Sequence, residues 1–104
     1  MTIIESVIHD EYDRNLRMQE AYRQEIAQLP RGSITRKVVN GKTYHYWMYR
    51  EAGKVVNKYI SSKDNDIDDL IRQVQKRRQL ESLVRKLKKE QREMERYMKV
   101  SGNG

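Results

Sequence analysis

Apolar side chains recur at steps of three and four through residues 2–29, a stretch with neither glycine nor proline. This spacing places them on one face of an amphipathic helix. Thr2 and Glu5 have the spacing of a capping box, and Pro30 removes a backbone donor and ends the helix. We therefore predict a helix over 2–29. Its stripe consists of Ile4, Ile8, Tyr12, Asn15, Met18, Tyr22, Ile26 and Leu29.

After Pro30 the pattern changes to short runs of β-branched and aromatic residues. Asn40-Gly41 separates the first run from the second, and Ala52-Gly53 separates the second from the third. Two-residue hairpin turns need positive φ at both positions, which Asn-Gly adopts most readily and Ala-Gly less so. The sequence predicts a three-stranded antiparallel β-meander over 33–61.

Two-residue turns would pair Val39 with Lys42 and Glu51 with Lys54, and alternation then sorts the side chains onto two faces. One face, which we call the tryptophan face, holds most of the aliphatic residues and the tryptophan, and we expect it to join the core. The other, which we call the tyrosine face, holds three tyrosines, and we expect it to meet solvent. The tryptophan face carries Ile34, Arg36, Val38, Thr43, His45, Trp47, Tyr49, Val56, Lys58 and Ile60. The tyrosine face carries Thr35, Lys37, Val39, Tyr44, Tyr46, Met48, Arg50, Val55, Asn57 and Tyr59.

A narrow apolar seam and the absence of breakers predict a long helix over 64–99, followed by a disordered tail over 100–104. The predicted fold class is α+β, with a helix, a meander and a coiled-coil-like long helix in a single domain over 1–104. The N-terminal helix can cover part of the seam as an antiparallel neighbour. We expect a second copy of the chain to cover the rest, which makes the protein a homodimer.

The net charge of +7 is unevenly distributed along the chain. Residues 1–30 carry six acidic and three basic side chains, whereas residues 31–63 carry one acidic and eight basic ones. This asymmetry favours a polyanionic partner, nucleic acid before an anionic membrane, because the seam is too narrow for a membrane-surface helix. The alternative is that the charge only keeps the protein in solution.

Tyrosine and cations come together on the tyrosine face, where rings can stack on bases and cations can neutralise phosphates. Cations on the long helix could follow a phosphate backbone. Two structural alternatives remain: the tyrosines pack against the long helix with their hydroxyls in solvent, and the helix cations form a solvated coiled-coil flank. The candidate nucleic-acid-binding residues are Lys37, Lys42, Tyr44, Tyr46, Arg50, Lys54, Tyr59, Lys76, Arg77 and Arg85.

The side chains that metal and covalent chemistry need are scarce. The chain has no cysteine, and its two histidines, His9 and His45, lie in no ligand pattern. The acidic run 64–69 lacks the glycine and the distal glutamate of a calcium loop and suits a helix start better. We expect a non-enzyme without metal or cofactor. The sequence shows no signal peptide or membrane span, so we also expect a cytoplasmic location.

A motif of turn residues, tyrosines and cations runs through residues 29–60. It consists of Leu29, Pro30, Gly32, Ser33, Lys37, Gly41, Tyr44, Tyr46, Tyr49, Arg50, Gly53, Lys54, Lys58, Tyr59 and Ile60. This motif resembles that of a family of small proteins from clostridial and related Firmicutes genomes, often found around phages and mobile elements. The resemblance implies a mobile-element context and supplies no mechanism. The meander is also similar in shape to the three-stranded DNA-binding module of tyrosine integrases.

Three functions are compatible with these features. The leading hypothesis is a non-catalytic nucleic-acid-binding accessory protein of a phage or mobile element. The second is a protein-interaction module, such as a phage-encoded inhibitor of a host nucleoprotein nuclease of the anti-CRISPR type. The third is a coiled-coil assembly factor that binds neither ligand.

Overall fold

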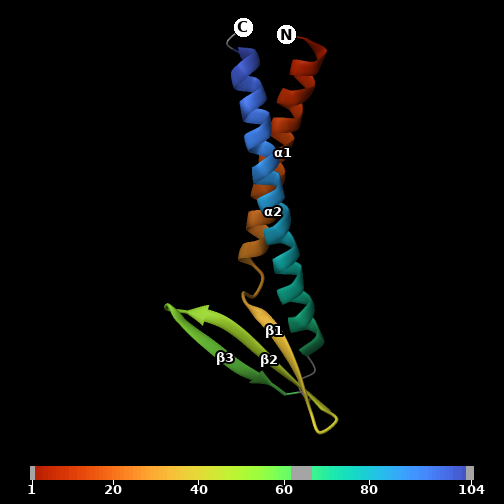
Figure 1. The fold of residues 1–104 in the computed structure, drawn as a ribbon, viewed down its shortest axis with the longest axis vertical. Coiled ribbons are helices and arrows are strands. Elements are labelled where there is room, and N and C mark those ends of the chain that lie inside the picture. Colours follow the sequence, from red (N-terminus) through yellow and green to blue (C-terminus); the bar gives the residue numbers. More distant parts are fainter. Residues whose placement is uncertain (1, 62–66, 103–104) are drawn as a thin grey trace. The chain divides into compact units, whose positions relative to one another are not determined.

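A computed structural model describes residues 2–61 and 67–102 (Figure 1). Its elements are α1 (Ile3–Ala27), β1 (Ser33–Val39), β2 (Lys42–Glu51), β3 (Lys54–Ile60) and α2 (Ile67–Gly102). The predicted α+β class, with a helix, a three-stranded meander and a long helix, is confirmed. The chain divides into two compact units, a helical unit with α1 and α2 from Leu80 onward, and a sheet unit over Gln28–Gln79.

The ends of both helices differ from their predicted positions. In α1, Glu5 N donates to Thr2 Oγ1 at 3.1 Å and Thr2 N donates to Glu5 Oε2 at 3.2 Å, which confirms the capping box. The helix ends at Ala27, not at residue 29, because a residue before proline avoids the α conformation and Pro30 offers no donor. The predicted start of the long helix at 64 lies outside the described residues. Its end was predicted too early, since α2 continues through residues 100–102 and reaches the first available glycine.

The meander has the register that the turns predicted. Val39 pairs with Lys42 and Glu51 with Lys54 in a sheet of order β1-β2-β3. Asn40 and Ala52 both have a φ of 51°, and the glycines that follow them have positive φ as well. Both connections are therefore two-residue turns with positive φ at each position, and the twist of such turns suits antiparallel strands.

The helical unit pairs α1 with the C-terminal part of α2 in antiparallel directions (Figure 1). The buried apolar residues of this unit all lie on α2 and are Leu80, Val84 and Leu87. On α1, by contrast, the buried side chains are two amides, Asn15 and Gln19. Leucine zippers bury aliphatic side chains at such positions, whereas here polar side chains meet at the centre of the interface. The prediction that the N-terminal helix covers part of the α2 seam is confirmed.

These buried amides belong to a continuous chain of hydrogen bonds, which we call the polar ladder. Gln19 Nε2 donates to Asn15 Oδ1 at 2.6 Å and to Gln91 Oε1 at 2.7 Å. Asn15 Nδ2 donates to the Leu87 carbonyl oxygen at 2.9 Å. Glu95 closes one end, where it accepts from Gln91 Nε2 at 2.7 Å. Because each buried amide has a partner, the ladder avoids the cost of an unpaired polar group.

The loop before β1 is tied to the rest of the sheet unit at three points. Arg77 Nη1 donates to the Leu29 carbonyl oxygen at 2.7 Å, and Trp47 Nε1 donates to the Arg31 carbonyl oxygen at 2.7 Å. Directly after Arg31, Gly32 has a φ of +106°, and a Cβ there would lie 2.1 Å from the Met48 carbonyl oxygen. The Leu-Pro-Arg-Gly segment of the motif therefore has a structural role, because only glycine fits its last position.

Candidate nucleic-acid interface

Three tyrosines form one cluster on the tyrosine face of the sheet. Strands β2 and β3 bring them together, since Tyr46 pairs directly with Tyr59 in the register. The ring centroids of Tyr44 and Tyr59 are 6.2 Å apart, and those of Tyr46 and Tyr59 are 5.6 Å apart. Both pairs are tilted, with interplanar angles of 47° and 57°. Tilted pairs are a favourable arrangement for aromatic rings, and they leave parts of the ring faces uncovered.

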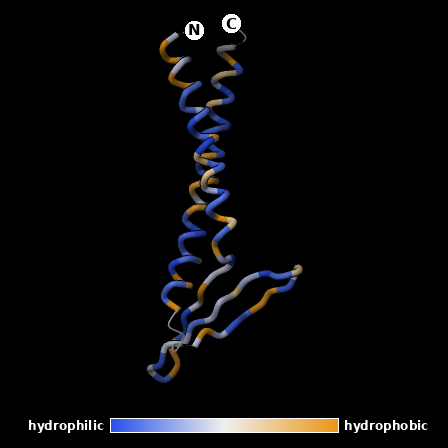
Figure 2. Tube along the Cα trace, turned by 180° about the vertical axis from the view of Figure 1, so that it is seen from behind, coloured by the Kyte–Doolittle hydropathy of each residue, from blue (hydrophilic) through white to orange (hydrophobic). Residues whose placement is uncertain are grey.

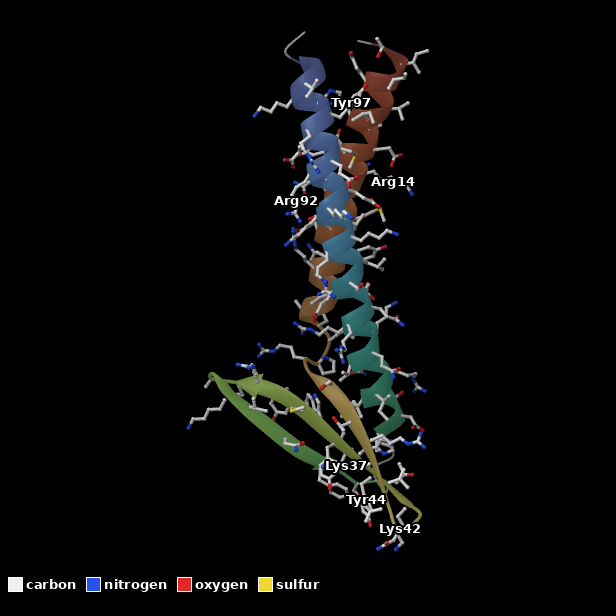
Figure 3. The ribbon with its side chains drawn as sticks, in the orientation of Figure 1. Arg14, Lys37, Lys42, Tyr44, Arg92 and Tyr97 are labelled. Atoms are coloured by element: carbon white, nitrogen blue, oxygen red, sulfur yellow. The ribbon has the colours of Figure 1, made fainter. Side chains whose placement is uncertain are left out.

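A lysine from β1 completes the cluster. Lys37 Nζ lies 5.4 Å from the centroid of the Tyr46 ring, within the range of a cation–π contact. Lys42 lies two residues before Tyr44 on the same strand, so alternation places it on the same face. Figure 3 shows Lys37, Tyr44 and Lys42 close together near the β1–β2 turn. Arg50 shares this face near the other end of β2.

The tyrosine face is open to solvent. Tyr59 keeps 50% of its surface exposed and Val55 keeps 56%, so neither lies under a helix. Tyr44 and Tyr46 are half-buried, and the rings around them account for part of that burial. Met48 and Val39 are exposed on the same face and extend the surface with apolar side chains. Sequence reasoning placed these apolar residues on the face but did not include them in the site.

The tryptophan face is covered less completely than expected. Ile60 is buried, and the rings of Trp47 and Tyr49 are half-buried with centroids 4.5 Å apart. Val38 is exposed near the β1–β2 turn. Six of the ten residues on this face are buried or half-buried, against two of the ten on the tyrosine face. The tryptophan face is therefore the more buried of the two, although it is not fully enclosed.

Four predicted site residues lie elsewhere. Lys54 pairs with Glu51 at the second turn, so alternation places it on the tryptophan face. Arg77 donates to the Leu29 carbonyl oxygen, which gives its guanidinium a structural role. Lys76 is exposed on the part of α2 that belongs to the sheet unit, and Arg85 is exposed in the helical unit. The structure therefore brings together Lys37, Lys42, Tyr44, Tyr46, Arg50 and Tyr59.

Among residues 2–61 and 67–102, no group of three or more histidine, cysteine or acidic side chains could hold a metal ion. None of the helices described is long and apolar enough to cross a membrane.

A family model matches residues 6–73, which include most of α1, the whole meander and the start of α2. The chain belongs to the DUF6788 family, a domain of unknown function. No curated protein and no solved structure matches the chain. The tyrosine cluster and the loop that Gly32 anchors lie inside the region shared with the family, whereas the α2 half of the polar ladder lies beyond it.

Proposed function

We propose that this protein binds nucleic acid without catalysis and that the tyrosine face is the contact surface. The observation that carries this proposal is the cluster of Tyr44, Tyr46 and Tyr59 with Lys37 against one ring. Three aromatic rings and a cation on an open sheet match the two needs of a nucleic-acid strand, a stacking surface for bases and a positive charge for phosphates. The motif resemblance adds a proposed role as an accessory protein of a phage or mobile element.

The geometry favours a single strand over a duplex. Bases in a duplex are stacked on one another and cannot reach the rings, whereas unpaired bases can turn toward them. Each base stacked on an aromatic side chain contributes about 1–3 kcal/mol, whatever its identity. We therefore expect binding with little sequence preference, in which two or three bases rest on the cluster while Lys37, Lys42 and Arg50 contact phosphates.

A mobility-shift titration with single-stranded and double-stranded probes tests the proposal. The variant Lys37→Ala with Tyr46→Ala removes one cation and the ring it contacts, and we expect it to weaken single-strand binding by at least about tenfold. Lys58→Ala is the matched control, because it removes an exposed cation from the other face. The proposal is wrong if the wild-type chain fails to bind at low salt, or if the control weakens binding as much as the double variant.

A further inference from the structure

A groove of about 620 Å³ runs along one side of the helical unit, between α1 and α2. Its floor is largely apolar, formed by Ile8 and Met18 from α1 and by Leu87, Met94 and Tyr97 from α2. Charged side chains stand at its rim: Glu11 and Arg14 on α1, and Glu90 and Glu93 on α2. An apolar strip between two charged rims is the usual layout of a helix-packing interface.

Most of the exposed apolar residues of the helical unit continue this strip. On α2, Leu83 lies one turn before Leu87, in the row that passes through Met94 and Tyr97 at steps of four and three. On α1, Ile4 and Val7 precede Glu11 at the same steps and are exposed. Figure 2 shows the hydrophobic first turns of α1, and Figure 3 shows Tyr97 on α2 beside them. Leu16 is also exposed, but on another side of α1.

We infer that a second copy of this chain fills the groove and that the two helical units form a four-helix bundle in which both units point the same way, which we call the parallel arrangement. The charges of the rim decide between arrangements. A two-fold axis parallel to the helices keeps every residue at its own height and places α1 of each copy opposite α2 of the other. Arg14 then lies across from Glu90 and Glu93 of the second copy, and symmetry forms this contact twice. Neither glutamate has an ion pair in the described part of the chain, and Arg14 has only the exposed Glu11, at 3.8 Å.

The opposite arrangement is disfavoured by the same residues. An axis perpendicular to the helices would place α1 against α1 and α2 against α2, so the two glutamate rims would meet and Arg14 would not face them. Like charges facing one another across an interface oppose association. The parallel bundle also joins the exposed apolar ends, because Ile4 and Val7 of one copy meet Tyr97 and Val100 of the other. The interface therefore consists of the whole α1–α2 groove, in contrast to the α2 seam alone that the sequence predicts.

Sedimentation velocity of the full chain tests this assembly. We expect a species of about 25 kDa, twice the 12.6 kDa of one chain. Leu83→Glu should raise the dimer dissociation constant by at least about tenfold, because it places a charge in the strip. Leu16→Glu is the matched control: both leucines are similarly exposed, at 42% and 39%, but Leu16 lies outside the strip. Circular dichroism should show that both variants remain helical.

A charge exchange makes the test specific for the parallel arrangement. Arg14→Glu should weaken the dimer by a similar factor, and adding Glu90→Arg and Glu93→Arg in the same chain should restore it. A monomer at about 0.1 mM would overturn the inference. Assemblies larger than a dimer would overturn the closed two-fold arrangement. Equal effects of Leu83→Glu and Leu16→Glu would show that the groove is not the interface. If the added arginines did not restore the dimer, the parallel arrangement would be wrong.

Discussion

Trp47 donates its indole proton to the carbonyl oxygen of Arg31 at 2.7 Å, and this bond holds the loop before β1 against β2. The neighbouring Gly32 lies so close to β2 that no side chain would fit at this position. The position of the loop thus depends on the indole donor of Trp47 and on the absence of a side chain at Gly32. Substitution of either residue should lower the stability of the sheet unit.

Gly32→Ala should destabilise the protein strongly. The added methyl group would meet the Met48 carbonyl oxygen, and alanine is strained at a φ of +106°. We expect a loss of at least about 2 kcal/mol and a Tm lower by about 10 °C in differential scanning calorimetry. Gly53→Ala is the control, since position 53 also has positive φ but has open space around it. Equal Tm losses in the two variants would show that the close approach to β2 contributes nothing.

Gln19→Ala should destabilise the helical unit. The substitution removes the donor shared by Asn15 and Gln91 and leaves buried polar atoms without partners. We expect urea unfolding to show a loss of about 1–3 kcal/mol. Gln24 offers a comparison, because its bond to Glu20 at 3.2 Å is exposed, and Gln24→Ala should cost less than about 0.5 kcal/mol. Indistinguishable unfolding curves for the two variants would argue against a stabilising ladder.

Arg77→Leu should lower stability and leave nucleic-acid affinity unchanged. Its guanidinium holds the Leu29 carbonyl oxygen, so its loss should cost about 1–3 kcal/mol. Lys76→Leu changes the exposed neighbour and should cost little. If Arg77→Leu weakened binding at a temperature where the variant stays folded, the guanidinium would have to contact the ligand as well.

The salt dependence of binding should reveal how many cations contact phosphates. With Lys37, Lys42 and Arg50 engaged, the logarithm of the single-strand affinity should fall against the logarithm of the salt concentration with a slope of about −2. Lys42→Gln should reduce this slope by about 0.7. Lys58→Gln should not change it, because Lys58 lies on the tryptophan face. Identical slopes for all three proteins would remove Lys42 from the interface.

Local chemistry explains which parts of the structure could be predicted. Asn40-Gly41 and Ala52-Gly53 determine both turns, and each turn determines the pairing of its strands, so the register and the two faces followed from a few residues. The cluster of Tyr44, Tyr46 and Tyr59 followed in turn, because the side chains that share a face depend only on register.

The remaining contacts depend on which distant segments meet. Arg77 resembled its basic neighbours until the fold brought the Leu29 carbonyl within its reach. Gln19 carried a weak signal, an amide four residues after Asn15 inside the apolar stripe, but its partner Gln91 lies on another helix. Lys54 is a predicted site residue, although the register that the turns predict places it on the tryptophan face.

The distribution of aromatic residues over the sheet has an optical consequence. The chain has a single tryptophan, and it lies on the face opposite the tyrosine cluster. Indole emission therefore reports on whatever covers the tryptophan face of the meander. A ligand that rests on the cluster should leave the indole spectrum nearly unshifted, whereas a ligand on the opposite face should shift it, so the unlabelled protein can indicate by its own luminescence which side of the sheet has been occupied.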